Sequence, residues 1–384
     1  MIRLHGMTWR HDRGYAPMVA TAKQFAVDHP EVAIDWEARS LSEFGEVHAD
    51  HLAEKYDLVV LDHPYVGALA ASRSFLALDE HLPSDLLRRH AMDSTGPSHA
   101  SYEINGHQWA LAIDAAAQVT GYRADLLERE GAAVPQSWGD VLTLGRIRKG
   151  FVSMPLLPLD AFLAFCSICA NAGEAPFSTE DASLSRSAAE YSLDMLQHLR
   201  ECSVEQALQE NPIAVWERMS TTDETAYCPL AFGYSNYARP GYRDYRLTFG
   251  EIPSAGHGPM GATLGGAGLA VSARCGHREA ALAYAAWVAS PECQSGLYVD
   301  AGGQPGSRAA WTSDHANAIT SGYFRATLPV LEQAWLRPRR GSFPAFQALG
   351  AEIVAGFLQR KDSLTHAVDQ LTRAVRMNSS RTER

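Results

Sequence analysis

The first 61 residues alternate between strand-like and helix-like segments, and this alternation leaves few folds open to the chain. Residues 2–8 and 32–36 alternate apolar with polar side chains as strands do, and 58–61 is a continuous apolar run. Such a run is typical of a parallel strand that is buried on both faces. A helix with Pro17 in its first turn and a polar-rich helix over 42–54 separate the three strands. This order predicts a doubly wound α/β sheet with helices on both sides.

Length and charge set the class of the protein and exclude two kinds of partner. The chain has 384 residues, which at roughly 100–200 residues per domain predicts two or three domains. With 46% hydrophobic and 20% charged residues, it can bury a core without metals or disulfides. The formal net charge is −11 and no long Lys/Arg run is present, so we expect no nucleic-acid partner. No stretch approaches the roughly 18 apolar residues that a membrane helix needs.

The cysteines and histidines form no pattern that holds a metal or a cofactor. Cys166 and Cys169 form a C-x-x-C inside an apolar, helix-like run, and we interpret them as small core residues rather than as a redox pair. No second C-x-x-C follows, which argues against structural zinc. His48 and His51 can share a helix face, but two histidines alone are not a metal site, and a solvated face is the preferred interpretation. We expect no metal and no cofactor.

Local signals place several later elements. Asn-Gly at 105–106, between alternating apolar residues, predicts a β-hairpin. Ser137 and Asp140 have the spacing of a capping box at the start of a helix. Residues 155–225 are mainly helical in pattern, and the Gly-rich stretch 261–271 predicts a turn that leads into a strand.

The order and spacing of several sequence blocks resemble a known family. The blocks are FAVDHPEV at 25–32, DLVVLD at 57–62, FLALD at 75–79, NGHQWAL at 105–111 with GYRADLL at 121–127, PQSWGD at 135–140, GGAGLAVS at 265–272 with AAWVASPE at 285–292, and RPR at 337–339 with FPAF at 343–346. Together they resemble the extracellular solute-binding proteins of carbohydrate ABC importers, the group that includes maltose-binding protein. The likeness runs nearly end to end.

This resemblance implies a periplasmic-binding-protein type II fold, with two doubly wound lobes joined by a hinge. Lobe one is expected to comprise 1–112 plus 263–310, and lobe two 113–262 plus 311–384. The resemblance also implies a monomer that captures a sugar, sugar acid or other small organic acid in an inter-lobe cleft by hinge closure. The expected protein partners are ABC permease subunits, at the periplasmic side or outer cell surface.

Candidate site residues follow the ends of the predicted strands, because ligands of open α/β sheets sit outside the carboxyl ends of strands. In the first lobe the candidates are Trp9, His11, Arg13, Tyr15, Arg39, Asp62, His63, Tyr65, Asp114 and Gly266. In the second lobe they are Ser153, Tyr234, Asn236, Tyr237 and Arg239. Trp and Tyr offer flat faces for a ring, while Asp, Asn and Arg can fix hydroxyls or a carboxylate. Two structural alternatives stay open: Asp62 as a helix cap, and Arg13 in a surface ion pair with Asp12.

Three functions compete at this point. The leading interpretation is a binding module for an ABC importer and not an enzyme. A hydrolase or transferase is one alternative, but the motifs G-x-S-x-G, H-E-x-x-H and G-x-x-x-x-G-K-[ST] are absent. A cytoplasmic small-molecule sensor on the same fold is the other. Residues 1–5 are strand-like and lack the apolar region of a signal peptide, which favours a cytoplasmic location if the chain is native as written.

The charge of the strand-end loops bears on the charge of the solute. These loops carry His11, Arg13, Arg39, His63 and Arg239 against Asp12, Asp62 and Asp114. They are neutral to basic in an acidic chain, and a guanidinium in a closing cleft is costly to desolvate unless it meets an anion. We therefore predict a solute that bears a carboxylate or a similar anionic group, such as a sugar acid or an aromatic acid. The alternative is a neutral sugar, with the arginines paired to nearby acids.

Overall fold

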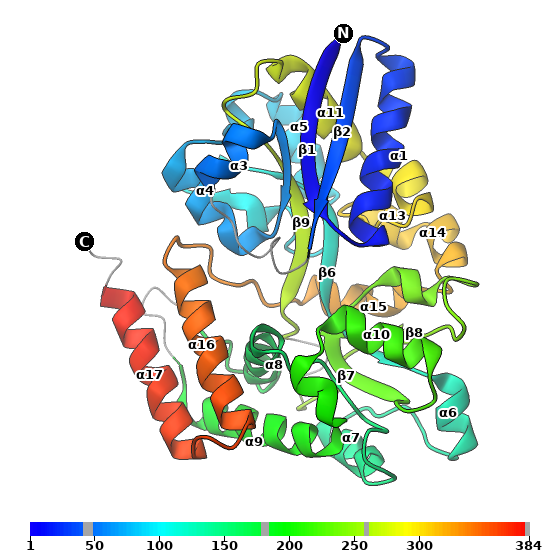
Figure 1. Cartoon of the computed structure of the whole chain (residues 1–384), viewed down its shortest axis with the longest axis vertical. Helices are drawn as coiled ribbons and strands as arrows, with labels where there is room; N and C mark the ends of the chain where they lie inside the picture. The colour runs from blue at the N-terminus through cyan, green and yellow to red at the C-terminus, as the bar shows by residue number, and fades with distance from the viewer. Residues whose placement is uncertain (41–48, 178–183, 257–260, 381–384) are drawn as a thin grey trace. The chain divides into compact units, whose positions relative to one another are not determined.

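The computed structural model describes residues 1–40, 49–177, 184–256 and 261–380. Its contacts divide into two compact units, each built from separate stretches of the chain (Figure 1). Unit 1 comprises Met1–Ala116, Gly265–Arg325 and Arg339–Gly341, and unit 2 comprises Ala117–Leu264, Ala326–Pro338 and Ser342–Arg384. The chain therefore leaves unit 1 after Ala116 and Arg325, where the sequence analysis placed the lobe boundaries at 112 and 310.

Unit 1 is an α/β unit whose strands lie in the order β2-β1-β3-β9-β6. β1 pairs in parallel with β2 and β3, as predicted, whereas β9 is antiparallel to β3. The elements are β1 (Ile2–Trp9), α1 (Asp12–Asp28), β2 (Val32–Arg39), α3 (Ala49–Lys55), β3 (Leu58–Leu61), η1 (His63–Tyr65), α4 (Val66–Ser72), η2 (Leu78–Glu80), α5 (Ser84–Met92), η3 (Ala100–Tyr102), β4 (Glu103–Ile104), β5 (His107–Gln108), β6 (Leu111–Tyr122), β9 (Leu264–Val271), α11 (Arg278–Val288), α12 (Pro291–Cys293), η6 (Gln294–Tyr298), α13 (Arg308–Thr312), α14 (Asp314–Ile319) and α15 (Tyr323–Glu332). β6, β9 and α15 each contain a change of unit.

The predicted start of the first helix was wrong. α1 begins at Asp12, so Pro17 lies inside the helix and not in its first turn. His11 caps the helix, because its Nδ1 accepts a hydrogen bond from the backbone N–H of Arg13 at 3.0 Å. This side-chain cap satisfies one of the backbone donors that the first turn leaves open. The early start moves Arg13 and Tyr15 from a loop onto the first turn of a helix.

Two short-range predictions are confirmed. β4 and β5 pair around Asn105 and Gly106, whose φ angles of 55° and 79° are the left-handed values that a two-residue hairpin turn needs. The Ser137 side chain accepts from the Asp140 N–H, and the Asp140 carboxylate accepts from the Ser137 N–H, which completes the capping box. The predicted helix over 42–54 is described only from the start of α3, and the residues before it, including His48, lie outside the described ranges.

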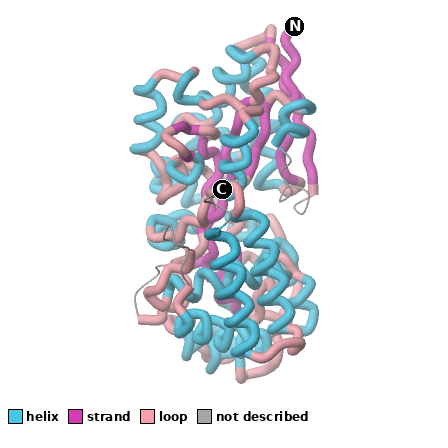
Figure 2. Tube along the Cα trace, turned by 90° about the vertical axis from the view of Figure 1, so that its left-hand side faces the viewer, coloured by secondary structure: helices cyan, strands magenta, loops and turns pink. Residues whose placement is uncertain are grey.

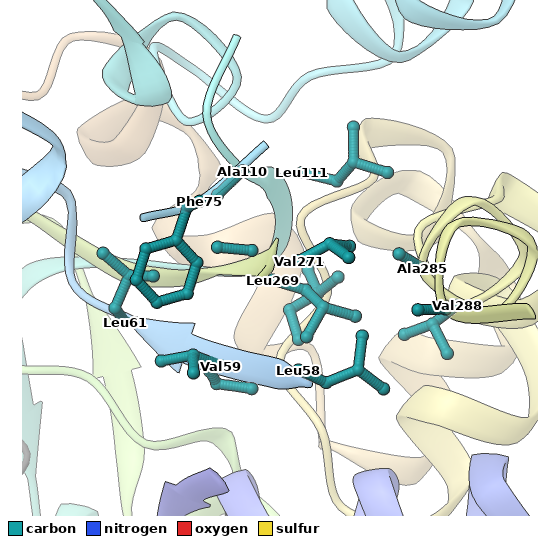
Figure 3. Close-up of a cluster of buried hydrophobic side chains, with 14 of the residues drawn as sticks. Leu58, Val59, Leu61, Phe75, Ala110, Leu111, Leu269, Val271, Ala285 and Val288 are labelled. Atoms are coloured by element: carbon teal, nitrogen blue, oxygen red, sulfur yellow. The ribbon is translucent and has the colours of Figure 1, made fainter. Parts of the chain in front are cut away.

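The core of unit 1 joins β3, β9 and α11. Leu58, Leu269 and Val271 lie beside Ala285 and Val288 of α11, as Figure 3 shows. All five side chains are fully buried, and burial of each large aliphatic side chain contributes about 1.5–3 kcal/mol to folding. This packing fixes β9 against β3 and so positions the strand that carries Gly266.

Unit 2 is mostly helical (Figure 2). α8 packs against α9 and α16, and α17 packs against α9 and α16. All the residues of α8 from Asp160 to Asn171 are buried, so this helix is the centre of the unit. The elements are α6 (Ala124–Arg129), α7 (Trp138–Gly145), α8 (Pro158–Asn171), α9 (Arg186–Cys202), η4 (Glu205–Gln209), α10 (Pro212–Thr221), β7 (Tyr227–Phe232), η5 (Ser235–Ala238), β8 (Thr248–Gly250), α16 (Phe343–Leu358) and α17 (Leu364–Ser380).

The six cysteines are all free thiols. Cys166 and Cys169 are buried inside α8, which confirms their interpretation as core residues. Burial raises the pKa of both thiols, that of Cys169 to about 12. We expect Cys202, which is half-buried at the end of α9, to be the one thiol that reacts with Ellman's reagent in the native protein, and all six to react after unfolding. Absorbance measured with and without denaturant checks this, and fast reaction of two or more native thiols would contradict it.

Within the described ranges, no helix combines the length and the apolar composition that a membrane span requires. In the same part of the chain, no group of three or more His, Cys, Asp or Glu side chains is arranged to hold a metal ion.

Candidate functional site

Three parallel strands of unit 1 end at a common edge of the sheet. β1 ends at Trp9, β2 at Arg39 and β3 at Leu61, and Trp9 lies opposite Arg39 in the register. Ligands of open α/β sheets bind beyond such carboxyl ends. The polar and aromatic candidates that gather here are called the unit 1 cluster, and they are Trp9, His11, Arg13, Asp62, His63 and Asp114.

A buried ion pair forms the centre of the unit 1 cluster. Arg13 Nε lies 2.8 Å from Asp114 Oδ2, and a second hydrogen bond joins Arg13 Nη2 to Asp114 Oδ1. The two side chains are only 5% and 0% exposed. Burial raises the pKa of the Asp114 carboxyl, and the Arg13 guanidinium opposes this by stabilising the charged form. The alternative of a surface pair with Asp12 was therefore wrong, both in the partner of Arg13 and in its location.

Asp62 has the capping role that the sequence analysis left open. Its Oδ1 accepts a hydrogen bond from the His63 N–H at 2.8 Å and lies 3.1 Å from His63 Nδ1. His63 is fully buried, with its ring edge-on to Tyr102. The Asp62 side chain is 23% exposed, so part of its carboxylate reaches the surface of unit 1.

The aromatic candidates of unit 1 differ in exposure. Trp9 is 4% exposed and its ring lies on Gly14, where an added Cβ would come within 2.3 Å of the indole. Tyr65 is half-buried and packs against the hydrophobic core. Tyr15 is 40% exposed on α1. Trp9 therefore packs the first turn of α1 onto β1, and Tyr15 is the aromatic side chain that unit 1 presents to solvent in this region.

The last two candidates of unit 1, Gly266 and Arg39, contact other parts of the same unit. Gly266 has a φ of 110°, and a Cβ there would lie 2.4 Å from the Asp114 carbonyl oxygen, so only glycine fits. Gly266 thereby lets β9 approach the strand that carries Asp114. Arg39 is half-buried, with its guanidinium 5.9 Å from the centre of the Tyr56 ring.

In unit 2, candidate residues gather on and before η5, directly after β7. Tyr234, Asn236 and Tyr237 are at most 5% exposed. The Tyr237 hydroxyl donates to Glu217 Oε1 at 2.8 Å, and Arg243 donates to both oxygens of the same carboxylate at 2.6 and 2.7 Å. Burial and the bond to Glu217 raise the pKa of the Tyr237 hydroxyl. Glu217 therefore fixes the position of Tyr237, whose ring meets that of Tyr234 edge-on.

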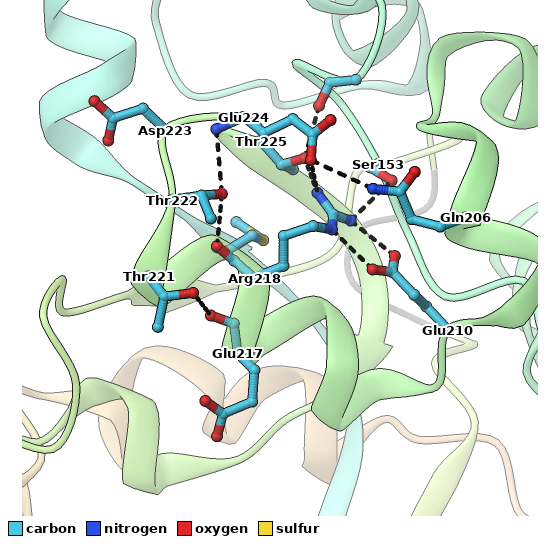
Figure 4. A network of polar contacts seen from close by, with 12 residues as sticks. Ser153, Gln206, Glu210, Glu217, Arg218, Thr221, Thr222, Asp223, Glu224 and Thr225 are labelled. Atoms are coloured by element: carbon cyan, nitrogen blue, oxygen red, sulfur yellow. Dashed lines mark hydrogen bonds and ion pairs between the residues drawn. The ribbon is translucent and has the colours of Figure 1, made fainter.

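The other two unit 2 candidates lie in different surroundings. Ser153 belongs to a polar network around Arg218, which Figure 4 shows. Arg218 donates to both carboxylate oxygens of Glu210 at 2.8 and 2.9 Å, and to Ser153 Oγ at 3.3 Å. Ser153 is fully buried, so its hydroxyl serves this internal network. Arg239 is half-buried where η5 ends.

Sequence reasoning missed Asp160, in the first turn of α8. The segment before α8 runs parallel to β7, because Val152 bridges Tyr227 in parallel and the Ser153 N–H donates to the Tyr227 carbonyl at 3.0 Å. α8 and η5 therefore follow carboxyl ends at the same edge of unit 2. Asp160 is 9% exposed, and burial raises its pKa to about 7. The available signal was that Asp160 is the only charged residue within 150–173.

Comparison with known proteins identifies the family. The chain matches the family model "Bacterial extracellular solute-binding protein" over residues 20–318, while no curated protein sequence matches it. An ABC transporter solute-binding protein from Agrobacterium radiobacter K84 in complex with ribitol is similar in structure, with a TM-score of 0.81, 18% identity and coverage of 98% of each chain. Maltose-bound MalE3 of T. maritima has a TM-score of 0.82 at 16% identity, covering 98% of this chain and 100% of that chain.

A third similar structure is an ABC transporter solute-binding protein from Thermotoga lettingae TMO bound with alpha-D-tagatose. Its TM-score is 0.83 at 14% identity, and the match covers 99% of this chain and 100% of that chain. These likenesses confirm the predicted type II periplasmic-binding-protein fold. The family match spans well over half of the chain. The protein therefore belongs to the bacterial extracellular solute-binding proteins.

Proposed function

We propose that the protein captures an uncharged sugar or sugar alcohol and delivers it to an ABC importer. The observation that carries the proposal is the buried pair of Arg13 and Asp114. The expectation of an anionic solute depended on such a guanidinium, and this one already has its counter-charge within the chain. The structural neighbours support the proposal, because ribitol, maltose and alpha-D-tagatose are all neutral and rich in hydroxyl groups.

The polar groups at the two carboxyl edges suit such a solute. In unit 1, the partly exposed carboxylate of Asp62 can accept hydrogen bonds from solute hydroxyls. In unit 2, Asn236 offers both a donor and an acceptor. Asp160, with a pKa of about 7, can either donate or accept near neutral pH. We infer that these three side chains bind the solute and that Tyr15 and Tyr234 supply apolar faces.

The family supports a proposal about partners and location. We propose that the two units are the two lobes of the binding protein, that they close on the solute, and that the monomer then docks on ABC permease subunits outside the cytoplasmic membrane. Closure makes the signal for transport depend on the solute, because a permease that recognises the closed form ignores the empty protein.

Titration calorimetry on the whole protein with ribitol, D-mannitol, maltose, D-tagatose and D-gluconate tests the proposal. We expect one of the neutral compounds to bind and D-gluconate not to bind. Small-angle scattering should then show a smaller radius of gyration with that solute than without it. Binding of D-gluconate with no binding of any neutral compound would contradict the proposed solute class, and an unchanged radius at saturation would contradict closure.

Replacing Asp62 with asparagine is expected to weaken binding of that solute by about 10–100-fold, because a hydrogen bond to a charged group is lost. Asparagine also caps helices, so the fold should be kept. The matched control is Asp35→Asn on β2, where a 55% exposed carboxylate pairs with Arg3 at the surface. Calorimetry compares the two variants, and an Asp62→Asn protein with the affinity of the control would remove Asp62 from the site.

A further inference from the structure

Unit 2 contains a cavity that is separate from its carboxyl edge. Its volume is about 400 Å³, within the roughly 300–1,000 Å³ of small-molecule sites. It is lined by residues from the loop after α7, from α9, from η4, and from the end of α16 and the two residues that follow it. The helices α9 and α16 also contact each other (Figure 1). Leu208 and Leu358 give it an apolar part, and the remaining lining is polar or charged.

The charges of the lining do not balance. Three cations, Lys149, Arg200 and Arg360, face two carboxylates, Glu201 and Glu205. Lys149 and Arg200 both bind Glu205, which lowers the pKa of that carboxyl to about 2. Arg360 binds Glu201 at 3.0 Å. Each carboxylate therefore pairs with at least one cation, and the lining holds one more cation than it has carboxylates, in a chain whose net charge is −11.

Of the three cations, Arg200 is the one whose surroundings best suit an added anion. Its side chain is only 15% exposed, yet within the described residues it makes a single hydrogen bond, from Nη2 to Glu205 at 2.7 Å. A guanidinium has five donors in a planar fork that matches a carboxylate. Arg200 lies in the last turn of α9, where the helix dipole favours a positive charge. An exposed lysine would meet that preference equally well, so the dipole does not account for a buried guanidinium. The Nε of Arg200 is buried and has no hydrogen-bond partner in the described part of the chain, and such a donor is costly unless an acceptor reaches it.

We propose that this cavity binds a small monocarboxylate, with the carboxylate on Arg200 and Arg360 and the short apolar body against Leu208 and Leu358. One added negative charge neutralises the lining, and the apolar contacts select an acid with a hydrocarbon part over inorganic anions. The site is independent of the proposed sugar site. None of its residues lies on η5 or in the first turn of α8, which carry the polar unit 2 residues of the sugar site.

The test uses the whole protein, with benzoate as the probe and benzamide as its neutral isostere, followed by titration calorimetry at low salt. Benzoate is expected to bind at least 10-fold more tightly than benzamide, and Arg200→Met and Arg360→Gln are each expected to weaken benzoate binding at least 10-fold. Arg360 is 75% exposed, so its variant should fold even if Arg200→Met does not. The matched control is Arg186→Gln, at the other end of α9 and 54% exposed, which should bind benzoate as the unmodified protein does.

Three results would overturn the proposal. The first is equal binding of benzoate and benzamide, which would show that charge has no part in it. The second is unchanged benzoate binding in the Arg360→Gln protein. The third is loss of benzoate binding when the solute of the proposed sugar site is present at saturation, which would place the probe in that site.

Discussion

Replacing Arg13 with methionine is expected to lower the free energy of unfolding by about 3–5 kcal/mol at pH 7. The substitution leaves Asp114, whose side chain is 0% exposed, as a buried carboxylate without its guanidinium. The pKa of Asp114 is already raised by burial, and removing Arg13 raises it further. In the variant the folded state then binds a proton more tightly than the unfolded state, so the loss of stability should be smaller at pH 5 than at pH 7. Denaturant unfolding at the two pH values measures both effects.

The matched control for this variant is Arg10→Met. Arg10 lies just before α1 and is exposed, and its side chain donates a long hydrogen bond to the Ala38 carbonyl at 3.4 Å, so we expect a change within about 0.5 kcal/mol. Adding Asp114→Leu to the Arg13→Met protein should recover at least half of the lost stability, because no buried charge is then unpaired. An Arg13→Met protein as stable as the Arg10→Met control would contradict the structural role of the pair.

Replacing Asp160 with asparagine is expected to raise the free energy of unfolding by about 2–4 kcal/mol at pH 8. The pKa of Asp160 is about 7 in the folded protein, against about 3.9 in an unfolded chain. A raised carboxyl pKa means that the folded state holds the proton more tightly, so stability falls as the pH rises from about 4 to 7 and the full cost is present above pH 7. The amide has no charge to desolvate, so the variant should lose this dependence on pH.

The same substitution separates stability from binding. If Asp160 binds the solute, Asp160→Asn should be more stable than the unmodified protein and yet bind the solute at least 10-fold more weakly. Asp194→Asn on α9, where the side chain is 64% exposed, is the matched control and should change neither property. An Asp160→Asn protein that is less stable at pH 8 would contradict the cost of ionising this buried carboxyl. A more stable variant with full affinity would remove Asp160 from the proposed site.

The features that the sequence predicted well are those that depend on neighbours along the chain. The hairpin at Asn105 and Gly106 and the capping box of Ser137 and Asp140 each need only a few adjacent residues, and both were found. The apolar run of β3 indicated burial on two faces, and all four of its residues are buried. Such signals depend on local geometry that a window of several residues contains.

The features that the sequence did not reveal depend on partners far along the chain. Nothing near Arg13 indicates that its counter-charge is Asp114, 101 positions away. The start of α1 was missed because its cap is His11, which is not among the usual capping residues, and because Pro17 suggested a later first turn. Asp160 was passed over because its burial comes from helices that pack around α8, which no local pattern shows.

The pairing of β3 with β9 has a consequence for how the protein is made. Leu58 lies opposite Val271, so the partner of β3 does not exist when the first three strands leave the ribosome. At roughly 5–20 residues per second, ten seconds or more of synthesis separate the two strands. During that interval one edge of a strand with four buried residues has its backbone hydrogen bonds unmade, and such an edge pairs readily with other chains. The nascent chain therefore exposes this edge for longer than a protein whose strands pair only with near neighbours along the chain.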